Sequence, residues 1–109
     1  MTGTRRSVVL GASGYIGGRL VPELLCYGHE VVVVARSPDK LRDVPWRHQV
    51  ELCGADLTVP DSLGAVFGRG DVVYYLVHSL TRPDFVKVDR AAARSVAAAA
   101  AAAHASRIV

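Results

Sequence analysis

The amino-acid sequence predicts an α/β fold in which a doubly wound parallel sheet carries helices on both faces. Short runs of β-branched residues alternate along the chain with segments whose apolar residues recur at helical spacing. Several of these runs are apolar at every position, which is typical of parallel strands covered on both sides. Because strand–helix alternation of this kind builds parallel sheets, we expect the strand order 3-2-1-4, with a fifth strand begun at the end of the chain.

One strand is expected before the first helix and another after it. Residues 8–10 are Val-Val-Leu and stop at a glycine, which is typical of a buried parallel strand. Residues 15–27 follow as a helix, because apolar side chains recur there and Gly28 supplies a left-handed stop. Pro22 lies inside this helix and should bend its axis. The strand at 30–35 contains four consecutive valines and completes a βαβ unit.

The middle of the chain continues the alternation with shorter elements. Residues 39–44 can form only a short helix, because a proline follows them. Residues 49–53 alternate apolar and polar side chains, as a third strand would. A short helix is expected at 60–67, where a proline occupies the first turn. The fourth strand is expected at 71–78, because its central residues are all apolar.

The last helix is the longest and ends close to the end of the chain. It is expected at 84–104, where a run of alanines strongly favours helix. Its apolar stripe consists of Phe85, Val88, Ala92, Val96, Ala99 and Ala103. Residues 107–109 then begin like a further strand. We therefore expect a single domain, residues 1–109, cut at the opening of the fifth strand.

Composition and charge exclude several classes of function. The chain is 50% hydrophobic with a net charge of +3, and its basic residues are not interleaved with aromatics, so we expect no nucleic-acid partner. Histidines and cysteines lack metal-ligand spacings, so we expect no metal and interpret Cys26 and Cys53 as buried free thiols. The apolar runs are too short for an export signal or a membrane span, which predicts a cytoplasmic protein without a membrane partner.

A glycine-rich segment lies between the first strand and the first helix, where a Rossmann-like fold binds the phosphates of a dinucleotide. Gly11 permits the tight turn, Gly14 lets a pyrophosphate approach the backbone, and Gly17 lets helix and strand pack closely. The candidate cofactor-binding residues here are Gly11, Ala12, Ser13, Gly14, Tyr15, Ile16 and Gly17. The alternative is that the glycines serve only a tight strand-to-helix turn.

The residue after the second strand indicates which dinucleotide is bound. A site selective for NAD carries Asp or Glu there, about 20 residues after the glycines, to bind the ribose hydroxyls. This chain has Arg36 instead. A guanidinium can bind a 2′-phosphate through two charge-assisted hydrogen bonds, so NADPH is favoured over NADH. Ser37 and Lys40 could add to this pocket, whereas the alternative is that Arg36 is a solvated loop charge.

Four segments resemble a known superfamily. They are Val-Leu-Gly-Ala-Ser-Gly-Tyr-Ile-Gly-Gly-Arg-Leu-Val-Pro-Glu-Leu-Leu at 9–25, Ala-Arg-Ser-Pro-Asp-Lys-Leu at 35–41, Gly-Ala-Asp-Leu at 54–57 and Val-Tyr-Tyr-Leu-Val-His-Ser at 73–79. Together they resemble the NAD(P)-binding part of atypical or extended short-chain dehydrogenase/reductases, and within these the nitrogen-regulator-like, NAD(P)H-binding subgroup. The resemblance covers essentially the whole chain and corresponds to the N-terminal part of such proteins.

The resemblance implies further cofactor contacts. Asp56 and Leu57 would contact the adenine, and the segment Leu76, Val77 and His78 would line the cofactor near its nicotinamide end. Without the resemblance, Asp56 can equally well be interpreted as a turn residue at the end of a strand. His78 can be interpreted as a strand-end histidine whose ring is hydrogen-bonded by the loop backbone. The family's catalytic Tyr-x-x-x-Lys pair is absent, because no tyrosine of this chain has a lysine four residues later. The catalytic residues are therefore left unassigned.

These expectations combine into a cofactor-binding role. The glycine segment and the resemblance imply the NADPH-binding part of an oxidoreductase that transfers hydride to or from a small organic substrate. The alternative is a non-catalytic NADPH sensor that regulates a protein partner. The sequence gives no indication of the oligomeric state.

Overall fold

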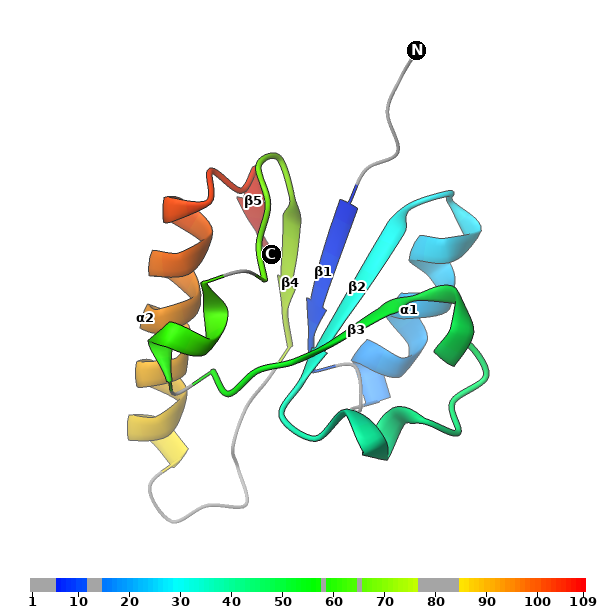
Figure 1. The fold of residues 1–109 in the computed structure, drawn as a ribbon, viewed down its shortest axis with the longest axis horizontal. Helices are drawn as coiled ribbons and strands as arrows, with labels where there is room; N and C mark the ends of the chain where they lie inside the picture. The colour runs from blue at the N-terminus through cyan, green and yellow to red at the C-terminus, as the bar shows by residue number, and fades with distance from the viewer. Residues whose placement is uncertain (1–5, 12–14, 58, 65, 77–84) are drawn as a thin grey trace.

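Over its described residues, the computed structural model contains a sheet of five strands, all parallel, in the order β3-β2-β1-β4-β5 (Figure 1). These are β1 (Arg6–Leu10), β2 (Glu30–Ala35), β3 (Glu51–Gly54), β4 (Val72–Tyr75) and β5 (Arg107–Ile108). The structure describes residues 6–11, 15–57, 59–64, 66–76 and 85–109. The doubly wound α/β fold predicted from the sequence is confirmed, including the strand order and the beginning of a fifth strand.

In the part of the chain that the structure describes, two α-helices pack against the sheet, and short 3-10 turns occupy the connections. The helices are α1 (Tyr15–Cys26) and α2 (Phe85–Ala102), and the turns are η1 (Pro38–Leu41), η2 (Arg47–Gln49) and η3 (Pro60–Leu63). Figure 1 shows α2 and η3 together at one side of the view, whereas α1 lies on the other side and packs against β1 and β2. Within the described ranges, no helix is long and apolar enough to cross a membrane.

The described residues form two apolar core clusters, one on each face of the sheet, because side chains alternate between the two faces of a strand. The cluster that includes α1 contains Val9, Val21, Leu24, Val31, Val33, Leu41 and Trp46. The cluster that includes α2 contains, among others, Val8, Leu10, Val32, Val34, Leu63, Val73, Val96 and Ala100. Neighbouring residues of β1 and β2 thus belong to different clusters, one on each face of the sheet. This arrangement explains why both strands are apolar at every central position.

Several element bounds differ from the sequence-based expectation. β1 begins at Arg6 rather than at residue 8, because Arg6 continues the parallel register opposite Glu30. The short helices expected at 39–44 and 60–67 are the 3-10 turns η1 and η3, since segments this short rarely sustain α-helix. β4 ends at Tyr75, three positions before the expected end.

The buried faces of the helices also differ in detail from the prediction. Among the residues of α2 whose side chains the structure describes, from residue 90 onward, the buried ones are Ala92, Val96 and Ala100, so the stripe there follows a spacing of four and passes through Ala100 rather than the half-buried Ala99. The side chains of Phe85 and Val88 lie outside the described residues. On α1, Ile16 is 66% exposed and does not belong to the core. It lies in the first turn of the helix, on the exposed side, whereas the next residue, Gly17, is buried.

The two cysteines are both free, but neither is fully buried. Cys26 is exposed at the last residue of α1, so the prediction that it is buried is wrong. Its neighbours Leu24 and Leu25 take the sheet-facing positions of that turn. Cys53 lies half-buried in β3, where burial first and the Glu51 carboxylate second raise the pKa of its thiol. A thiol with a raised pKa is a weak nucleophile near neutral pH.

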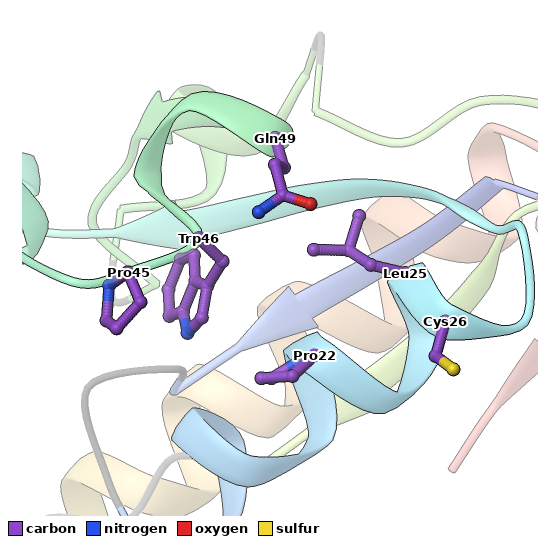
Figure 2. A pocket seen from close by; sticks show the side chains of 6 residues that line it. All are labelled: Pro22, Leu25, Cys26, Pro45, Trp46 and Gln49. Carbon is purple, nitrogen blue, oxygen red and sulfur yellow. The ribbon is translucent and has the colours of Figure 1, made fainter.

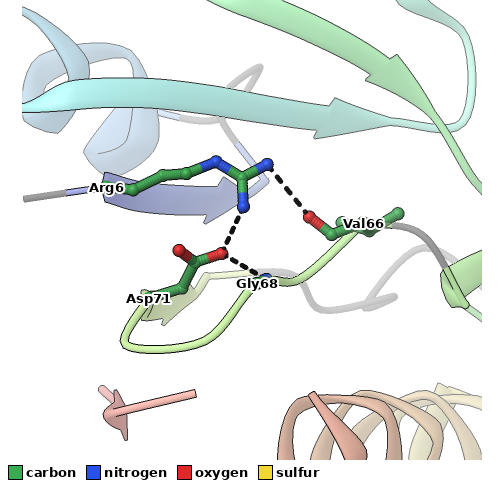
Figure 3. A network of polar contacts seen from close by, with 4 residues as sticks. All are labelled: Arg6, Val66, Gly68 and Asp71. Carbon is green, nitrogen blue, oxygen red and sulfur yellow. Dashed lines mark hydrogen bonds and ion pairs between the residues drawn. The ribbon is translucent and has the colours of Figure 1, made fainter. Parts of the chain in front are cut away.

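An ion pair connects β1 to the segment before β4 (Figure 3). Arg6 Nη1 lies 2.6 Å from Asp71 Oδ2, and the side chains of Arg6 and Asp71 are 28% and 2% exposed. The Gly68 amide donates to the same carboxylate oxygen at 2.7 Å. Arg6 Nη2 also donates to the carbonyl oxygen of Val66 at 3.3 Å. The Asp71 carbonyl accepts from the Ser106 amide at 2.7 Å, so Asp71 joins three segments distant in sequence.

Gly28→Ala is expected to lower the free energy of unfolding by about 1–2 kcal/mol, because Gly28 has φ +81°, a conformation that disfavours a Cβ. The added methyl group would meet no atom within 4 Å, so the cost is backbone strain alone. Urea denaturation measures this loss in the free energy of unfolding. Gly54→Ala is the matched control: its Cβ would lie 3.5 Å from Pro38 Cγ, an ordinary contact. A Gly28→Ala variant as stable as wild type would contradict the strain.

Candidate functional site

The candidate site lies along the edge of the sheet where the parallel strands β1 to β4 end. The last residue of β1 pairs in register with residues near the ends of β2 and β4, and the last residues of β2 and β3 pair with each other. The chain leaves the strands there through Gly11, Arg36 and Asp56. Three positions predicted separately from the sequence therefore share one edge, where ligands bind in open α/β sheets.

The segment after β1 has the backbone conformation that the glycine motif predicts. Gly11 has φ +99°, which favours glycine over every other residue. α1 begins at Tyr15, and Gly17 is buried in its first turn, as close packing of helix and strand requires. Ile16 points away from the core. The predicted positions Ala12, Ser13 and Gly14 lie outside the described residues, as does the side chain of Tyr15.

Arg36 is the first residue after β2, and its side chain is exposed. The backbone on either side of it is held in place. The Ala55 amide donates to the carbonyl oxygen of Ala35 at 3.1 Å, which ties the ends of β2 and β3 together. On the other side, η1 places Leu41, 2% exposed, in the core cluster beneath α1. Arg36 thus projects a guanidinium into solvent from a short, anchored turn.

Asp56 and Leu57 follow β3, and both are half-buried. Leu57 packs against the core cluster on the α2 face. The backbone of Asp56 is held by the hydroxyl group of Ser62, which accepts from the Asp56 amide at 3.1 Å and lies 2.7 Å from its carbonyl oxygen. The predicted positions Val77 and His78, beyond β4, lie outside the described residues.

Sequence reasoning missed Ser62, because a serine within a short helical turn is common and its hydrogen-bond partners become visible only when the loop is closed. It also missed a pocket of about 320 Å³ beside the second half of α1 (Figure 2). The pocket is lined by Pro22, Leu25, Cys26, Pro45, Trp46 and Gln49. It lies near the C-terminal end of α1, whereas the glycine segment lies at its N-terminal end.

A doubly wound parallel sheet with a positive-φ glycine between β1 and the N-terminus of α1 defines a domain of the dinucleotide-binding class. The chain belongs to the NAD(P)H-binding family, whose model matches residues 11–109. Its cofactor is therefore a nicotinamide dinucleotide. This membership is consistent with the resemblance to extended short-chain dehydrogenase/reductases.

Individual known proteins match the chain over part of their length. MIOREX complex component 2 of Saccharomyces cerevisiae is 33% identical over 78 residues, which cover 67% of this chain and 27% of that protein. A Rossmann-fold NAD(P)-binding family protein from Shigella flexneri has a TM-score of 0.78 at 22% identity, covering 97% and 50% of the two chains. A nucleoside-diphosphate-sugar epimerase from Staphylococcus aureus has a TM-score of 0.75 at 21% identity, covering 94% and 36%. At these identities the structural similarity shows the fold.

Proposed function

We propose that this chain binds NADPH in preference to NADH and is the cofactor-binding part of an oxidoreductase that transfers hydride to or from a small organic substrate. The observation that carries the proposal is Arg36, an exposed guanidinium in the position where an NAD-selective site has a carboxylate. It lies at the same edge of the sheet as Gly11, so one dinucleotide could reach both. A guanidinium fits a 2′-phosphate through paired, charge-assisted hydrogen bonds.

Each group of residues at this edge would bind a different part of the dinucleotide. The turn at Gly11 and the N-terminus of α1, a helix of 12 residues, favour the pyrophosphate, because helix N-terminal amides and the helix dipole attract anions. Arg36 would bind the 2′-phosphate, and Asp56 and Leu57 would contact the adenine. The nicotinamide would then lie beyond β4, near His78. The bound cofactor supplies the hydride, and the chain supplies its position and orientation.

Arg36→Ala is expected to weaken NADPH binding by about 1.5–3 kcal/mol, roughly 10- to 150-fold in dissociation constant, because a charged hydrogen-bond partner is lost. NADH binding should change little, since NADH has no 2′-phosphate. Isothermal titration of both dinucleotides against wild type and variant measures the difference.

The matched control is Arg69→Ala, which removes another exposed arginine from the turn before β4, at the opposite edge of the sheet. It changes the net charge equally, so it reports any unspecific electrostatic effect. Unchanged NADPH affinity in Arg36→Ala, or an equal loss in Arg69→Ala, would refute the 2′-phosphate pocket. Equal affinity of the wild type for both dinucleotides would do the same.

A further inference from the structure

The hydroxyl group of Ser62 forms a compact set of hydrogen bonds with the loop that follows β3. It accepts from the Asp56 amide at 3.1 Å. Its single hydrogen is shared between the carbonyl oxygens of Asp56 at 2.7 Å and Val59 at 2.8 Å. The Asp56 carbonyl also accepts from the Val59 amide at 3.0 Å. One side chain thus contacts both backbone polar groups of Asp56.

The position of Ser62 is itself fixed by the core. The next residue, Leu63, is 1% exposed and packs in the cluster that contains Val96 and Ala100 of α2. The Ser62 amide donates to the Val59 carbonyl at 3.0 Å, which closes the turn. Because η3 is held by the core, the hydrogen bonds of Ser62 fix the backbone of Asp56, which lies where the strands of the sheet end. A surface loop held in this way loses less entropy when a ligand binds to it.

We propose that Ser62 is a positioning residue for recognition of the adenine base, acting through Asp56. The inference rests on the proposed function, in which Arg36 holds the ribose 2′-phosphate. Since β3 is the neighbour of β2, a base attached to that ribose falls beside the residues that follow β3. The exocyclic amino group of adenine donates hydrogen bonds, and an ionised Asp carboxylate only accepts them. Ser62 fixes the backbone from which this carboxylate extends.

The test compares two dinucleotides that differ only at the base. Hypoxanthine carries a carbonyl oxygen where adenine carries its amino group, so the ratio of dissociation constants for the hypoxanthine analogue of NADPH and for NADPH measures adenine recognition. Wild type is expected to prefer NADPH. Ser62→Ala should weaken NADPH binding roughly three- to tenfold, the effect of one neutral hydrogen bond, and bring the ratio close to one. Ser62→Thr, which keeps the hydroxyl group, should restore the preference.

The control is Ser106→Ala, which removes an exposed serine before β5, at the opposite edge of the sheet, and should leave the ratio unchanged. If Ser62→Ala does not fold, Ser62→Cys keeps the side-chain volume with a much weaker hydrogen-bonding group and replaces it. If Ser62→Ala leaves the ratio unchanged, whether or not both dinucleotides bind more weakly, the role of Ser62 is overturned while the proposed function stays intact. Failure of the wild type to bind either dinucleotide would overturn both.

Discussion

Arg6→Met is expected to lower the free energy of unfolding by about 3–5 kcal/mol, because it leaves a buried carboxylate without its counter-charge. The Asp71 side chain is only 2% exposed, and Arg6 Nη1 lies 2.6 Å from its Oδ2. After the substitution, the Gly68 amide is the one donor to this carboxylate that the structure still records among the described residues. Chemical denaturation monitored by circular dichroism measures the loss.

Substituting the other partner of the ion pair, Asp71, distinguishes the cost of an unpaired buried charge from the cost of lost packing. In Asp71→Leu the remaining Arg6 side chain, 28% exposed, can turn toward water, so its loss should be smaller than that of Arg6→Met. The double variant Arg6→Met/Asp71→Leu should recover much of the stability, because replacing both partners of a buried pair by apolar residues is often close to neutral. A double variant as unstable as the sum of the single variants would show that the two side chains are not coupled.

The sheet could be predicted from the sequence because its central strands β1 and β2 are buried on both faces. A short run that is apolar at every position and consists of β-branched residues, as at Val31 to Val34, favours a buried strand over a helix. The residues at which the strands begin and end could not be predicted from such a pattern. Arg6 is in β1 although it is charged, since its charge is neutralised by Asp71, a residue distant in sequence. Contacts of this range are absent from any local pattern.

The candidate site could be predicted to the extent that it depends on strand ends. Gly11 and Arg36 were found by their places after the first and second strands, and the register of a parallel sheet brings such places together. Ser62 could not be found in this way, because its role depends on the closure of a loop onto Asp56. Ile16, a predicted cofactor contact, is 66% exposed, and helical periodicity alone does not reveal which apolar residues of an amphipathic helix pack on the sheet.

Leu63→Ala is expected to lower the free energy of unfolding by about 2–5 kcal/mol, because it leaves a cavity in a closed part of the core. Leu63 is 1% exposed and lies in the cluster on the α2 face, together with Val66, Phe67 and Val96. η3 is a 3-10 turn of 4 residues, so it contributes little stability of its own and depends on this packing. Urea denaturation gives the magnitude.

Leu25→Ala removes the same atoms from the opposite face and is the matched control. Leu25 is half-buried and lines the pocket beside α1, so its truncation enlarges a space that already opens to water instead of creating a closed void (Figure 2). Its cost should therefore be well below that of Leu63→Ala, because the cavity contribution is absent and less apolar area is lost. Equal losses in the two variants would contradict the assignment of Leu63 as the anchor that holds η3, and with it Ser62, against α2.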